Sequence, residues 1–137
     1  MIKKYYSKIR PDVLLHLVTD INKLKEERID IAPENEYLQL ALLNFSKGKT
    51  FKPHKHIIKE KLTDIAQESW FVYKGSVECI FYYLDDSILT REKIIEGQVS
   101  MTFRGGHNYK ILEDNTLVLE YKTGHYLGIE NDKKFIK

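Results

Sequence analysis

Hydrophobic and polar positions follow two different periods along this chain. In the first part, apolar residues recur between Val13 and Leu24 at the spacing of an amphipathic helix. Asp12, which follows a proline, is a suitable N-cap for such a helix. A linker that contains Pro33 comes next. We therefore expect an N-terminal helical segment and linker over residues 1–36.

From Tyr37 onward the period is two, which is typical of strands with one buried face. Short runs rich in β-forming residues are separated by turn signals such as Gly75-Ser76. The expected strands are Tyr37–Phe45, Thr50–His56, Glu68–Tyr73, Val77–Leu84, Leu89–Ile95, Val99–Phe103, Asn108–Leu112 and Leu117–Lys122. So many short strands favour an all-β jelly-roll barrel over residues 37–124. The tail, residues 125–137, is expected to pack on this barrel.

Composition narrows the class of protein further. A length of 137 residues suits one domain, and 42% hydrophobic with 31% charged residues is ordinary for a globular chain. The net charge of +2 gives no reason to expect a nucleic-acid partner. The single cysteine, Cys79, excludes an internal disulfide and a cysteine-based zinc site. The apolar stretch Val13–Val18 is too short for a signal peptide or a membrane span. We expect a soluble, cytoplasmic protein without a membrane partner.

Residues with metal-binding chemistry concentrate just before the long connection at 57–67. In a strand, His54 and His56 point to the same face, so two imidazoles can meet at one point, with Lys52 on that face too. A His-x-His pair of this kind is a reasonable beginning for a metal site. The alternative interpretation is a pair of half-exposed histidines on an edge strand.

The surrounding spacing resembles the two sequence motifs of the cupin superfamily. Gly48 is followed after five residues by His54-x-His56, Glu68 is followed after six residues by a glycine, and a glycine-led strand ends in His107. The resemblance implies a cupin-type jelly-roll barrel that holds one divalent metal ion. The implied ligands are His54, His56, Glu68 and His107. Such a set suits Zn, Fe, Mn or Ni without distinguishing them.

The chain departs from the cupin pattern in three places. Eleven residues, 57–67, separate the histidine pair from Glu68, where the family has three or four. Glu60 lies at the usual distance and is the alternative carboxylate ligand. We prefer Glu68, because only Glu68 is followed by the hydrophobic strand and by the glycine at the correct count. The second motif lacks its proline, and Arg104 with two glycines precedes His107.

A closer resemblance is to small cupin metalloproteins related to the WbuC-like cupins, which occur near sugar-nucleotide and surface-polysaccharide genes. It covers the chain from about residue 30 onward. The stretches that carry it are Leu38-Gln39-Leu40-Ala41, Gly48 to His56, Gln67-Glu68-Ser69-Trp70, Arg104 to Tyr109 and Glu120 to Tyr126. His125 replaces the usual proline of the last stretch. The resemblance implies a homodimer and a small-molecule ligand such as a nucleotide-sugar.

Other residues are candidates to complete the site. Trp70 shares a face with Glu68 and is a candidate wall for a sugar ring or a base, although core packing also explains it. Tyr109 shares a face with His107 and is a candidate general acid or hydroxyl contact. Arg104 is a candidate for binding a carboxylate or phosphate, and Lys52 belongs to a lysine-rich segment that can attract an anionic ligand. Solvated loop residues are the simpler interpretation of both.

Three functions are consistent with these residues. The first is isomerisation or epimerisation of an activated sugar, in which Tyr109 or a histidine moves a proton. The second is a metal-dependent dioxygenase. The third is a non-catalytic barrel in which the metal is structural or orients a ligand. The first is preferred because of the genes that accompany the similar cupins.

Overall fold

The structure is a computed structural model that describes residues 2–23, 25–57, 63–124, 130 and 133–136. Strands dominate the described residues, and the fold is all-β. The strands are β1 Lys3–Tyr6, β2 Leu14–Asp20, β3 Arg28–Asp30, β4 Ala41–Leu43, β5 Glu68–Lys74, β6 Ser76–Tyr82, β7 Ile88–Ile95, β8 Gln98–Thr102, β9 His107–Ile111 and β10 Leu117–Lys122. A short 3-10 helix, η1, covers Ile21–Lys23. In the described part of the chain, no helix is long and apolar enough to span a membrane.

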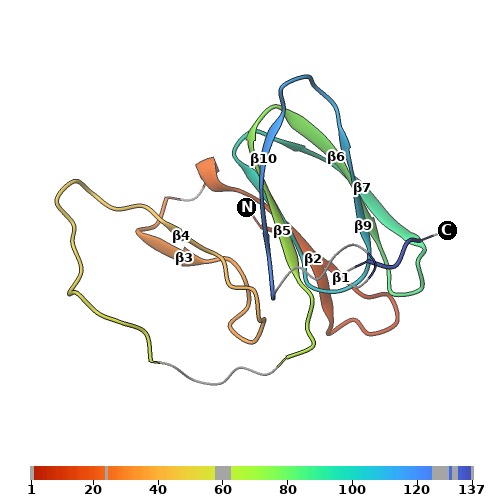
Figure 1. Cartoon of the computed structure of the whole chain (residues 1–137), viewed down its shortest axis with the longest axis horizontal. Coiled ribbons are helices and arrows are strands. Elements are labelled where there is room, and N and C mark those ends of the chain that lie inside the picture. The colour runs from red at the N-terminus through yellow and green to blue at the C-terminus, as the bar shows by residue number, and fades with distance from the viewer. Residues whose placement is uncertain (1, 24, 58–62, 125–129, 131–132, 137) are drawn as a thin grey trace.

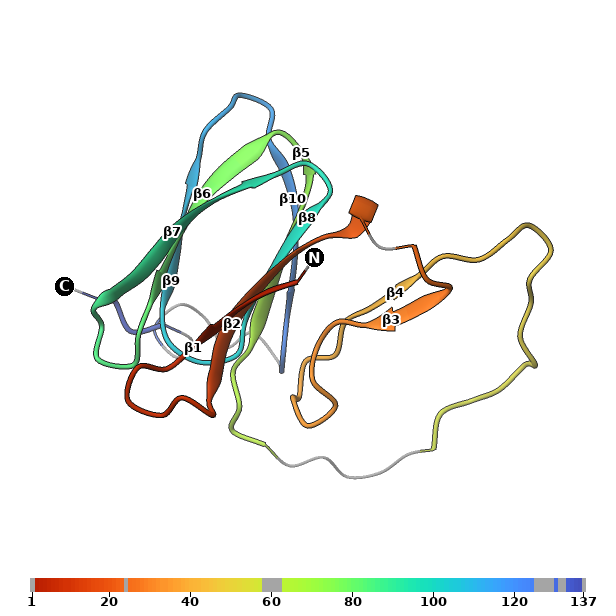
Figure 2. The same cartoon turned by 180° about the vertical axis from the view of Figure 1, so that it is seen from behind.

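Two antiparallel sheets face each other, and a hairpin lies beside them. The larger sheet has five strands in the order β1-β2-β8-β5-β10, and the smaller has three in the order β7-β6-β9. Figures 1 and 2 show these two sheets stacked, with the β3–β4 hairpin on the far side of the five-stranded sheet. The two stacked sheets remain separate rather than merging into one continuous sheet.

The five-stranded sheet has a hydrophobic core on each of its faces. Between the two sheets, Val72 of β5 packs with Phe81 of β6 and Ile94 of β7. On the other face, Leu17 of β2 and Met101 of β8 pack with the segment between β3 and β4. The central strands β2 and β8 are therefore covered on both sides.

This double coverage explains why the predicted N-terminal helix is wrong. Residues Leu14–Asp20 form strand β2, which pairs with β1 on one edge and with β8 on the other. All of its side chains except the last are buried, so the run is apolar on both faces and lacks the alternation of a half-buried strand. An apolar run of this length does not distinguish a buried strand from a helix. Residues Lys3–Tyr6 and Leu14–Asp20 thus belong to the main sheet.

The predicted strands agree with the structure from residue 68 onward and differ before it. Strands β5 to β10 lie at or within one or two residues of the predicted ranges. The predicted strand Tyr37–Phe45 is reduced to β4, and residues 44–57 contain no strand. In Figure 1 this segment forms a wide excursion away from the stacked sheets. Its side chains from residue 46 to residue 57 are exposed.

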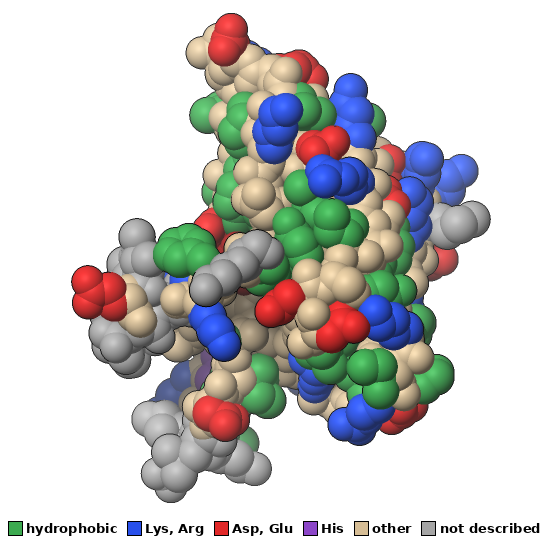
Figure 3. Space-filling model, turned by 90° about the vertical axis from the view of Figure 1, so that its right-hand side faces the viewer, with side chains coloured by type: hydrophobic (Ala, Val, Ile, Leu, Met, Phe, Trp, Pro, Cys, Tyr) green, Lys and Arg blue, Asp and Glu red, His purple; other side chains and the backbone are tan. Residues whose placement is uncertain are grey.

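The surface shown in Figure 3 is mixed in character. Basic and acidic side chains are interspersed with hydrophobic ones over this face, and within its described part neither sign gathers into one broad patch. The ion pair between Arg91 and Glu78, at 3.2 Å, is one such neighbouring pair of opposite charges. This distribution agrees with the net charge of +2.

Candidate functional site

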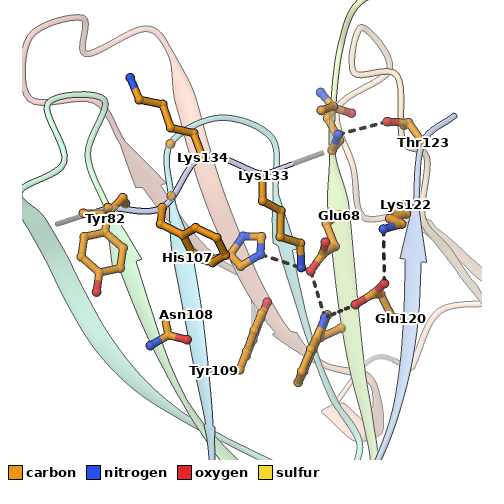
Figure 4. Close-up of a pocket in the computed structure, with 17 residues that line it drawn as sticks. Glu68, Tyr82, His107, Asn108, Tyr109, Glu120, Lys122, Thr123, Lys133 and Lys134 are labelled. Atoms are coloured by element: carbon orange, nitrogen blue, oxygen red, sulfur yellow. Dashed lines mark hydrogen bonds and ion pairs between the residues drawn. The ribbon is translucent and has the colours of Figure 1, made fainter. Parts of the chain in front are cut away.

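A cavity of about 580 Å³ opens between the two stacked sheets, on the side where β5, β9 and β10 meet. Figure 4 shows side chains from these strands pointing into it. Lys133 of the C-terminal segment reaches in toward Glu68, and Lys134 points away from the other side chains. The lining residues that the argument uses are Glu68, Trp70, His107, Tyr109, Glu120 and Lys133. The period of two places Glu68 and Trp70 on the inner face of β5, as the sequence predicts.

One polar contact in the cavity joins the two sheets. Nε2 of His107, on β9, lies 3.1 Å from Oε1 of Glu68, on β5. Burial alone would raise the pKa of Glu68, but the hydrogen bond and charge of His107, the charge of Lys133 and the Trp70 hydrogen bond lower it overall. The carboxylate is therefore ionised at neutral pH, and the contact is an ion pair whenever His107 is protonated.

Trp70 is held between two carboxylates and an aromatic ring. Its indole Nε1 donates to Oε1 of Glu68 at 3.0 Å and to Oε2 of Glu120 at 3.1 Å. Its ring lies parallel to that of Tyr109, with 3.8 Å between centroids and an angle of 2°. Lys122 reaches Oε1 of Glu120 at 3.8 Å. The indole orientation is thus fixed from three directions, and the stack connects β5 with β9.

Tyr109 contributes its ring to the cavity, while its hydroxyl is bonded to the core side. The phenol oxygen lies 2.8 Å from Oγ of Ser100 on β8. Burial and the nearby Cys79 thiol raise the pKa of Tyr109 well above its ordinary value, so the phenol stays protonated at neutral pH. As the structure stands, the group suits the role of a wall behind Trp70 better than that of the general acid predicted from the sequence.

Behind His107, a chain of hydrogen bonds leads away from the cavity into the core. Nδ1 of His107 lies 3.1 Å from Oγ1 of Thr102, which lies 3.1 Å from Nδ1 of His16. Nε2 of His16 lies 3.1 Å from the carbonyl oxygen of Tyr82. Burial lowers the pKa of His16 to about 4, so this histidine is neutral at pH 7. Sequence reasoning missed this chain; a lone histidine inside an apolar run was the available signal.

The turn before His107 passes close over this chain. Gly105 has a φ of +80°, and a Cβ added there would lie 2.5 Å from the carbonyl oxygen of Tyr82 and 3.2 Å from Nε2 of His16. Glycine is the residue that both adopts this backbone conformation easily and leaves the space open. Gly105 is therefore required by the close packing of this turn against Tyr82 and His16, a reason that the cupin pattern does not contain.

Arg104 and Lys52, the two predicted ligand-binding cations, lie outside the cavity lining. Nη1 of Arg104 donates to Oε1 of Glu36 at 2.8 Å, and the Glu36 side chain is only 5% exposed. Lys52 is exposed on the segment without strands. Arg104 therefore binds the segment between β3 and β4, which covers the outer face of the five-stranded sheet.

Of the four predicted metal ligands, Glu68 and His107 are in contact, whereas His54 and His56 lie apart from them on the exposed segment. His54 and His56 are exposed, their ring centroids lie 5.5 Å from each other, and Nδ1 of His54 donates to the carbonyl of Lys52 at 2.9 Å. Among the described residues, no group of three His, Cys, Asp or Glu side chains is arranged to hold a metal ion. Glu60 and His125 lie outside the described residues. The four-ligand site stays a prediction.

Comparison with known proteins finds no matching family model, no matching curated protein and no matching solved structure. The class that the structure defines is an all-β protein with two stacked sheets and a polar, aromatic cavity between them. What this cavity does must be argued from its own residues.

Proposed function

We propose that this protein binds a nucleotide-sugar or related carbohydrate in the cavity between its sheets, and that it isomerises or epimerises this ligand. The observation that carries the proposal is the 3.1 Å contact between Glu68 and His107 inside a cavity of about 580 Å³. A cavity of this size accommodates a ligand of about drug or nucleotide size. A carboxylate and an imidazole in contact are a suitable pair for moving a proton.

The lining suits a carbohydrate joined to phosphate. The carboxylates of Glu68 and Glu120 accept hydrogen bonds from sugar hydroxyls, and the half-exposed Trp70 offers an aromatic surface for a sugar ring or a base. Lys133, which reaches into the cavity toward Glu68 in Figure 4, supplies positive charge for phosphate. The carboxylate acceptors and this cation match the two ends of a nucleotide-sugar.

The chemistry assigned to the pair is a proton transfer at carbon. The ionised Glu68 accepts a proton from a carbon next to a carbonyl group, while His107, in the protonated form that carries hydrogen on both ring nitrogens, donates a hydrogen bond from Nε2 to the oxygen on which negative charge develops. Returning the proton to the neighbouring carbon, while a hydroxyl proton passes between the two oxygens, gives the isomer. Returning it to the opposite face of the same carbon, after the ligand has turned over in the cavity, gives the epimer. Every proton that leaves the ligand is thereby returned to it.

The proposal includes a cupin-type jelly roll with one divalent metal ion. Among the described strands, β9 pairs only with β6, so its other edge is open beside the cavity. Residues 50–56 have the strand pattern described above, and open strand edges readily accept a further strand. Pairing along β9 would bring His54 and His56 toward His107 and Glu68.

Titration calorimetry with UDP-glucose and GDP-mannose tests the ligand class, with UDP, GDP and glucose as separate arms. We expect a nucleotide-sugar to bind more tightly than its parts, and Glu68→Gln to weaken binding at least tenfold. Glu78→Gln is the matched control, because Glu78 is paired with Arg91 on the outer surface of β6 and away from the cavity lining. Equal binding by Glu68→Gln and the parent protein would remove the basis of the proposal.

A further inference from the structure

The polar side chains behind His107 are buried and joined in a continuous chain of hydrogen bonds. Thr102 and His16 are 5% and 0% exposed, and each forms a hydrogen bond within the chain that runs from His107 to the Tyr82 carbonyl. By contrast, the hydroxyl of the buried Thr19 has no partner among the described residues. A buried polar chain in which every member is satisfied restricts where each proton can lie.

The positions of the protons follow from the end of the chain. The Tyr82 carbonyl can only accept, so Nε2 of His16 carries a proton and donates it. A neutral His16 then has a lone pair on Nδ1, and this lone pair accepts the hydroxyl proton of Thr102. Because that hydroxyl has only one proton, its oxygen must accept from Nδ1 of His107. Nδ1 of His107 therefore carries a proton.

We infer that Thr102 and His16 are positioning residues that keep a proton on Nδ1 of His107 and thereby present its Nε2 to the cavity. Nε2 is the atom that faces Glu68, at 3.1 Å. The use of this nitrogen to bind a ligand rests on the proposed function, whereas the placement of the proton does not. A histidine whose far nitrogen donates to a fixed acceptor has a defined orientation and greater basicity at its near nitrogen.

Strand pairing and packing fix the positions of the groups in this chain of hydrogen bonds. His16 and Thr102 are directly paired between β2 and β8, so their side chains leave neighbouring strands on the same face. The His16 ring stacks on Phe81 with 4.4 Å between centroids, which fixes the plane of the ring. The bond from Nε2 to the Tyr82 carbonyl leaves Nδ1 as the nitrogen that faces Thr102. Tyr82 presents its carbonyl next to Gly105, where a side chain would intrude. The acceptor at the end of the chain is therefore part of the fold.

The first test is the ¹⁵N spectrum of the imidazoles in the protein without added ligand. We expect a protonated-type Nδ1 signal for His107 and a slowly exchanging proton on that nitrogen. Thr102→Val should shift the Nδ1 signal toward the unprotonated type or remove the observable proton. Thr102→Ser retains the hydroxyl and should restore the parent spectrum. Thr19→Val, the same substitution at a buried hydroxyl without a partner, should leave His107 unchanged.

Two outcomes overturn the inference. One is an unprotonated Nδ1 in the parent protein, and the other is an identical His107 spectrum in folded Thr102→Val and parent protein. A second readout is the affinity for UDP-glucose, which Thr102→Val should lower by about 5- to 10-fold, the effect of one lost hydrogen bond. If the spectra behave as expected and UDP-glucose does not bind to any variant, the proposed function fails and the proton placement stands.

Discussion

Arg104 donates to the buried carboxylate of Glu36 at 2.8 Å, and this contact joins the turn before His107 to the segment between β3 and β4. The other oxygen of Glu36 accepts from Nε2 of Gln67 at 2.7 Å, and the side-chain Oε1 of Gln67 accepts from the backbone amide of Leu38 at 2.7 Å. Three distant parts of the sequence thus meet at one buried carboxylate. The segment covering the outer core is held there by polar contacts as well as by apolar packing.

Removing the arginine should destabilise the protein. Arg104→Ala leaves the Glu36 carboxylate without its cationic partner, and we expect a loss of about 1–3 kcal/mol in the free energy of unfolding. Arg91→Ala is the control, because its pair with Glu78 is more exposed and should contribute about 0–1 kcal/mol. Urea unfolding of both variants measures the difference. Equal losses would mean that the Glu36 contact is no stronger than a surface pair.

Stability should depend on pH through His16. Its pKa is lowered by burial from the ordinary 6.5 to about 4, so the unfolded chain binds a proton more readily than the folded one. Stability is therefore complete above pH 6.5 and is lost as the pH falls from 6.5 toward 4, by up to about 3 kcal/mol. His16→Gln should flatten this part of the curve in urea unfolding at pH 7, 5.5 and 4.5. An unchanged slope would contradict the assignment.

The single tryptophan provides a direct signal for cavity binding. The chain has one Trp, and Trp70 lines the cavity, so a ligand there must change its environment. We expect UDP-glucose to alter the intrinsic emission, with the same affinity that calorimetry gives. Trp70→Phe should remove the signal and weaken binding, because the ring keeps its stack on Tyr109 and loses the donor to both carboxylates. Calorimetric binding without any change in emission would locate the ligand elsewhere.

Metal binding should order the exposed histidine segment. We expect about one divalent ion per chain by elemental analysis of protein purified without added metal, and slower amide exchange over residues 50–57 in the loaded protein than in the chelated one. The double variant His54→Ala, His56→Ala should lose the ion. The double variant Lys52→Ala, Lys55→Ala, in the same segment, should retain it. Full metal content in the histidine variant would exclude the proposed ligand set.

Two glycines with similar backbone angles allow the stability cost of the backbone conformation to be measured apart from the cost of steric crowding. Gly105 and Gly48 have φ values of +80° and +91°, but a Cβ would meet the Tyr82 carbonyl at 2.5 Å only at Gly105, and open space at Gly48. We expect Gly48→Ala to cost about 1 kcal/mol from the backbone angle alone. Gly105→Ala should cost about 1–3 kcal/mol more. Thermal unfolding measures both, and similar losses would mean that the turn shifts freely.

The sequence predicts those parts of the fold in which burial alternates. Strands β5, β6, β7, β9 and β10 each have a residue in the inter-sheet core, and the period of two locates them closely. Strands β2 and β8 are buried on both faces; β8 lies between two glycine turn signals, whereas β2 has no alternation of burial that would have identified it. Residues 50–56 alternate in the same way as a strand, yet this segment lies apart from the sheets, because local pattern does not specify a pairing partner.

The sequence predicted those site residues whose positions follow from local spacing. The glycine count after Glu68 led to the carboxylate that contacts His107, and the period of two placed Trp70 beside it. The roles of Thr102 and His16 depend on strand pairing across a long sequence separation, which no local pattern contains. Arg104 looked available for a ligand because its acceptor, Glu36, is also distant in sequence.

The pairing of β2 with β8 sets the order in which this chain can fold during synthesis. His16 and Thr102 are 86 residues apart, so β2 has only the short, exposed β1 as a partner until most of the chain has been made. At about 5–20 residues per second, the apolar stretch of β2 waits several seconds for its central position in the sheet. The nascent protein thus leaves an almost fully buried strand exposed for several seconds, and this stretch is where a chaperone would be expected to bind.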